Sequence, residues 1–62
     1  MIASFYNAET EKHISDAEIE VVPRVGDRVN GIWIVIQVEH AIVMGIGEAS
    51  GHAIVVHMMR LP

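Results

Sequence analysis

VVPRVGDRVNGIWIVIQVEH, residues 21–40, joins a polar corner to a long run of branched apolar residues. Pro23 cannot donate a hydrogen bond to a central ladder, so one strand should end before it. Gly26-Asp27 suits a turn, and Asn30-Gly31 is a strong short hairpin signal. The stretch therefore predicts strands that meet at a polar corner, followed by a long strand over residues 32–43.

The N-terminal third predicts a strand at residues 2–6 and a polar turn at residues 7–13. Residues 17–22 then alternate acidic and apolar side chains, which favours a strand with its acidic residues facing outward. Ser15 and Glu18 have the spacing of a capping box, so a helical turn is the alternative at this place.

The C-terminal third predicts a glycine-bounded loop at residues 45–51 and a last strand at residues 52–61. The whole chain thus predicts four to five antiparallel strands joined by short turns, with a long C-terminal hairpin. Short strands at this spacing are typical of a small all-β barrel. Residues 1–62 form a single domain in this interpretation, because so short a chain has material for one core.

The register of the C-terminal hairpin is predicted with Glu39 opposite His57, because this pairing stacks apolar on apolar residues and sets an acid against a histidine. A shift of one residue, with Glu39 opposite Val56, is the alternative. In either register both faces of the hairpin are largely apolar. We therefore expect the hairpin to bend until the barrel covers both faces, or to place one face against another subunit.

Size and charge limit the classes of function. A 62-residue chain without cysteine has no disulfide or thiolate metal site, so self-association is a natural source of stability. The formal net charge is −4, all of it contributed by the first twenty residues. Without a basic stripe, we expect no nucleic-acid partner. With no targeting or spanning segment, we expect no membrane partner and a cytoplasmic or virion-associated protein.

VPRVGDRV, a turn and then IWIVIQVEH resemble the small SH3-like barrels, in which a Gly-Asp turn leads into a long bent strand. The chain over residues 17–61 is also similar to small uncharacterised all-β proteins of tailed phages and mobile elements. This resemblance implies a barrel that serves in binding or assembly, and it implies no catalytic residues. The Sm-like ring proteins share the barrel, so ring formation is an alternative.

Four histidines and one glutamate are the candidate metal ligands, although no metal site is favoured, and no cofactor is expected. Zinc or nickel needs three or four nitrogen or oxygen ligands that converge on one point. On strands, His52 and His57 are five residues apart and so face opposite sides, and no standard ligand spacing is present. The candidates are Glu39, His40, His52 and His57, with His13 further away along the chain.

Catalysis is not expected, because no serine lies on a nucleophile elbow beside a base. The loop GIGEASG, residues 45–51, lacks the spacing and the following helix of a phosphate-binding fingerprint. The corner at Arg24–Arg28 contains no Arg-Gly-Asp tripeptide. There Asp27 is expected to accept backbone hydrogen bonds in a turn.

The main hypothesis is therefore a non-enzymatic assembly or adaptor module that forms a homo-oligomer or binds a protein partner through an apolar strand face. Tryptophan and methionine are enriched in interface cores. The predicted interface residues are Trp33, Val35, Met44, Val55, Met59 and Leu61. A small metal- or ligand-binding protein is the first alternative, and a nucleic-acid-binding barrel is the second.

Overall fold

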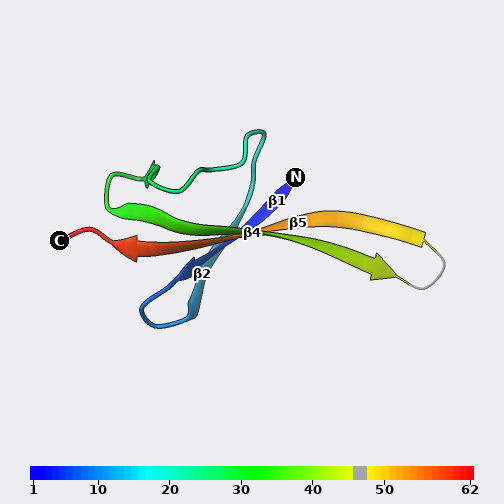
Figure 1. The fold of residues 1–62 in the computed structure, drawn as a ribbon, viewed down its shortest axis with the longest axis horizontal. Coiled ribbons are helices and arrows are strands. Elements are labelled where there is room, and N and C mark those ends of the chain that lie inside the picture. The colour runs from blue at the N-terminus through cyan, green and yellow to red at the C-terminus, as the bar shows by residue number, and fades with distance from the viewer. Residues whose placement is uncertain (46–47) are drawn as a thin grey trace.

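The computed structural model describes residues 1–45 and 48–62, and of residues 41–45 and 48–52 it describes the backbone alone. The described chain is all-β, and no helix in it is long and apolar enough to cross a membrane. Its five strands form a sheet in the order β2-β1-β5-β4-β3, which curls into a half-barrel (Figure 1). The predicted all-β class and small barrel are confirmed. The strands are β1 (Ile2–Asn7), β2 (Lys12–Glu18), β3 (Arg28–Val29), β4 (Trp33–Gly45) and β5 (Glu48–Arg60).

The sheet is mixed, which corrects the prediction of purely antiparallel strands. β1 pairs antiparallel with β2 and parallel with β5, with Ala3 beside Ile54 and Asn7 beside Met58. The two strands of the C-terminal hairpin are antiparallel, as expected. A parallel neighbour needs a crossover rather than a tight turn, and here the crossover contains the rest of the chain.

The first hairpin differs from its prediction at the second strand. β2 spans Lys12–Glu18 and not residues 17–22, and neither a helical turn nor a strand lies at residues 19–22. The reason is a tight turn over residues 8–11, in which the Asn7 side chain accepts a bond from the backbone N–H of Glu9 at 2.9 Å. Glu11 has a φ of 60° there, and the chain reverses before the alternating acidic residues begin.

The polar corner is architectural, as its sequence predicts. A carboxylate oxygen of Asp27 accepts a bond from the backbone N–H of Arg24 at 2.9 Å. Asn30 and Gly31 have positive φ values of 53° and 72°, which suits asparagine and glycine and turns β3 into β4. The backbone of Val29 pairs with that of Trp33, so the predicted hairpin is confirmed.

The predicted register of the long hairpin is wrong by two residues. Glu39 pairs with Val55, and His57 pairs with Gln37. Since two is the period of a strand, the shift leaves these side chains on the face where they were expected. A bulge between Val35 and Gln37 leaves Ile36 unpaired. Residues of β4 before the bulge therefore lie on the opposite face from the one that regular alternation predicts.

The core depends on that bulge. Without it, Val35 would share a face with Gln37 and Glu39. With it, Val35 turns to the same side as Val38, and it is 1% exposed. Ile19, Val22, Val29, Trp33 and Val38 pack against the core from its margins. The buried core residues are Ala3, Phe5, Val35, Ile54, Val56 and Met58.

The far part of the long hairpin extends beyond the rest of the sheet (Figure 1). β1 pairs with β5 only from Ile54 onward, and β3 pairs with β4 only at Trp33 and Ile34. The pairing of β4 with β5 continues to Gly45 and Glu48. The predicted loop over residues 45–51 is therefore too long, because β5 begins at Glu48; residues 46–47 lie outside the described residues.

Candidate functional site

The face of the sheet opposite the core, which we call the outer face, collects polar side chains from four strands. Alternation places Tyr6 outward because Phe5 is buried, and His57 outward because Val56 and Met58 are buried. Tyr6 and His57 are partners in the β1–β5 register, and Gln37 continues the row on β4. His13 pairs with Tyr6 and extends the row to β2.

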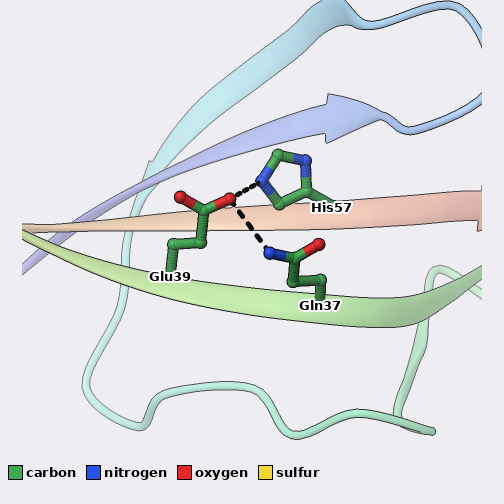
Figure 2. A network of polar contacts seen from close by, with 3 residues as sticks. All are labelled: Gln37, Glu39 and His57. Carbon is green, nitrogen blue, oxygen red and sulfur yellow. Dashed lines mark hydrogen bonds and ion pairs between the residues drawn. The ribbon is translucent and has the colours of Figure 1, made fainter.

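A network of three residues joins β4 and β5 on the outer face (Figure 2). Oε1 of Glu39 lies 2.7 Å from Nε2 of His57 and 3.2 Å from Nε2 of Gln37. An ionised carboxylate only accepts hydrogen bonds, so both nitrogens donate. The Glu39 side chain is 53% exposed and that of His57 is 27% exposed, so this network borders solvent.

Aromatic contacts connect this network to β1 and β2. The ring of Tyr6 stacks beside that of His57, with centroids 6.1 Å apart and planes at 29°. On β2, His13 meets Tyr6 edge to face at 5.2 Å and 68°. Tyr6 thus contacts an imidazole ring on each of the two strands beside β1.

A second histidine–carboxylate pair lies at the β2 edge. Nε2 of His13 is 2.7 Å from Oδ1 of Asp16. The hydrogen bond with His13, and next the one with Ser4, lowers the pKa of Asp16 below its ordinary value of 3.8. A bulge between Phe5 and Tyr6 makes this arrangement, since it leaves Ile14 unpaired and sets His13 beside Tyr6.

A hollow of about 480 Å³ opens on the outer face. Its size falls within the range of ligand pockets, ~300–1,000 Å³. It contains both carboxylate and aromatic groups, and it lies over β1, β4 and β5. Its lining residues are Tyr6, Ala8, Glu11, Ile36, Gln37, Glu39, Val55 and His57.

The structure brings together only part of the set of candidate metal ligands. Glu39 and His57 are in contact, while His40 pairs with Ile54 and so belongs to the opposite face of the strand. The side chain of His52 lies outside the described residues. Among the side chains that the structure describes, no group of three or more histidines and carboxylates is arranged to hold a metal ion.

The predicted interface residues fall in different environments. Val35 is buried in the core of the chain, so its side chain cannot contact a second subunit. Trp33 packs against the margin of the core, and Val55 lines the hollow. Met59 is 39% exposed. Leu61 is half-buried, and the side chain of Met44 lies outside the described part of the chain.

Sequence reasoning missed Tyr6, His13, Asp16 and Gln37 as members of one face. Alternation around Phe5 could have placed Tyr6 outward. The contribution of β2 could not be read, because its strand was expected further along the chain. Comparisons of the chain with protein-family models, with curated proteins and with solved structures found no match.

Proposed function

We propose that the protein is a non-enzymatic assembly module that forms a homo-oligomer through its long hairpin. In this assembly two copies pair their β4 strands antiparallel about a twofold axis. The observation that carries the proposal is the outer edge of β4. In the part of the chain that the structure describes, β3 pairs with β4 only at Trp33 and Ile34, so no further strand continues the sheet along β4 beyond them.

Soluble proteins protect such edges with lysine, proline, bulges or a covering segment, because a free edge pairs readily with another chain. Irregularities interrupt β4 at Ile36 and between Ile42 and Met44, so the regular part of its edge is residues 37–42. Residues 36–45, IQVEHAIVMG, contain neither lysine nor proline, and Glu39 is their single acidic residue. An edge of this composition favours pairing with a second copy. Most of the acidic residues that give the net negative charge lie on or near β2, at the other end of the strand order from β4, although Glu11 lines the hollow beside Ile36 and Glu39.

The small core supports the same conclusion. Six residues are buried in the described chain, and a single core in so short a chain contributes little stability. The part of the hairpin between the loop and Ile54 consists of β4 and β5 alone, and an isolated two-stranded ribbon is marginally stable in water. A second copy would convert two ribbons into one four-stranded sheet. An adaptor role, in which a strand of a different partner protein takes the place of the second copy, would use the same edge.

Light scattering coupled to size exclusion tests this function at micromolar protein concentration. We expect a dimer or larger species for the wild type and a monomer for Ile42→Lys, a change within the free edge. Val21→Lys is the matched control, because Val21 is 80% exposed and lies outside the strands, and this variant should assemble normally.

A strictly monomeric wild type would reject the proposal, as would an Ile42→Lys variant that still assembles. If that variant fails to fold, the wild type alone decides. The thermal midpoint of an assembling chain rises with protein concentration, whereas that of a monomer does not.

A further inference from the structure

The hollow on the outer face combines negative charge with apolar walls. Glu39 and Glu11 line it from two sides, and no lysine or arginine is among its lining residues. The donors that reach Glu39 in the described chain are Gln37, which is neutral, and the imidazole of His57. Both bond to Oε1, so neither engages Oε2. The hollow thus offers a carboxylate oxygen to a positively charged ligand.

The remaining walls suit the aliphatic stem of a long cationic side chain. Ile36 and Val55 provide apolar surface beside the carboxylate, and Ile36 is 40% exposed. Tyr6 adds an aromatic surface, which attracts cations through its ring quadrupole. A guanidinium group is planar and stacks on aromatic rings, so it fits these walls better than a compact ammonium does.

We propose that this hollow binds an arginine side chain of a basic peptide segment in a partner protein. Glu39 accepts the guanidinium hydrogen bonds, Glu11 adds negative charge, and Tyr6, Ile36 and Val55 contact the stem. The volume of about 480 Å³ leaves room for main-chain atoms beside the arginine. The net charge of −4 attracts a basic partner over distance. This binding uses the side chains of Ile36, Gln37 and Glu39 rather than the backbone edge of β4, so it does not require the assembly.

Amide chemical shifts of the ¹⁵N-labelled protein test the proposal during titration with acetyl-Gly-Arg-Gly-amide. We expect saturable shifts at Tyr6, Val55 and His57. The same peptide with citrulline in place of arginine keeps the shape and loses the charge, and it should bind about tenfold or more weakly. N-propylguanidine supplies the arginine side chain with a single positive charge and without main-chain atoms, and it should bind more weakly than the arginine peptide.

Two variants locate the charge that matters. Glu39→Gln should weaken binding of the arginine peptide by about tenfold or more, because it removes the proposed charge-assisted bonds. Glu18→Gln makes the same chemical change on β2, outside the hollow, and should leave binding unchanged. Equal binding of the citrulline peptide, shifts that map elsewhere, absence of saturable shifts, or N-propylguanidine binding as tightly as the peptide would each overturn the proposal.

Discussion

Glu39 and His57 are in contact across the β4–β5 pair, although neither is the register partner of the other. Nε2 of His57 lies 2.7 Å from Oε1 of Glu39, and the two residues are diagonal neighbours on one face. Diagonal positions on a sheet are within reach of long side chains. The contact therefore forms although the observed register differs by two residues from the one in which Glu39 and His57 would be direct partners.

A double-mutant cycle with Glu39→Gln and His57→Gln measures this contact. Both side chains border solvent, so we expect a coupling of about 0.2–1 kcal/mol in the free energy of unfolding. Urea denaturation of the wild type, the two single variants and the double variant supplies the four values. Strictly additive effects would show that the two side chains do not interact in solution.

Deletion of Ile36 should be tolerated. Ile36 is the unpaired residue of the β4 bulge, so its removal leaves Val35 and Gln37 in regular alternation on opposite faces. Deletion of Val38 is the matched control, because it removes a residue packed against the core and moves Glu39 toward the core face. Thermal melts followed by circular dichroism should show cooperative unfolding for the first deletion and its loss for the second. Cooperative unfolding of the Val38 deletion together with its loss in the Ile36 deletion would contradict the position of the bulge at Ile36.

Met58 and Met59 are adjacent and chemically identical, so they form an internal control for the position of the core. Met58 is 2% exposed and Met59 is 39% exposed. Met58→Ala should lower the free energy of unfolding by about 2–5 kcal/mol. Met59→Ala should cost no more than about 1 kcal/mol. Chemical denaturation ranks the two variants, and a larger loss for Met59→Ala would contradict the described register.

The stability should depend on the ionisation of Asp16. Its pKa is lowered in the folded chain, mainly by the hydrogen bond with His13, so the ionised form stabilises the fold above pH 3.8. This contribution disappears as the pH falls through the lowered pKa. Asp16→Asn should therefore be less stable than the wild type at neutral pH, and the two should converge in acid.

Thermal midpoints from neutral pH to below pH 3.8 provide this measurement. Glu20→Gln is the control, because it removes an exposed carboxyl outside the strands and should not reproduce the convergence. A gap between wild type and Asp16→Asn that persists unchanged in acid would exclude a role for Asp16 ionisation.

The turns and the long hairpin could be predicted because their signals are local. Asn30-Gly31 and Asp27 act on neighbouring backbone, and the structure places them as expected. The parallel pairing of β1 with β5 could not be predicted, because it depends on residues some fifty positions apart that carry no shared pattern. The site on the outer face could not be predicted for the same reason, since its residues come from four strands that become neighbours only in the folded sheet.

The bulge at Ile36 shows a second limit. A bulge inserts one residue and changes the face of those before it, and no composition signal marks it in a run of branched apolar residues. It moved Val35 from the predicted interface to the core. Glu39 and His57 stayed together because both lie on the same side of the bulge.

The neighbourhood of β1 and β5 has a consequence for the order of folding. A chain that leaves the ribosome N-terminus first can form the β1–β2 hairpin early, but the buried residues of β1 have no partners until Ile54, Val56 and Met58 are made. Closing so long a loop costs entropy, and this cost is met before the contacts between β1 and β5 contribute any stability. Synthesis of the last strand therefore precedes the core, and until then the inner edge of β1 is open to solvent.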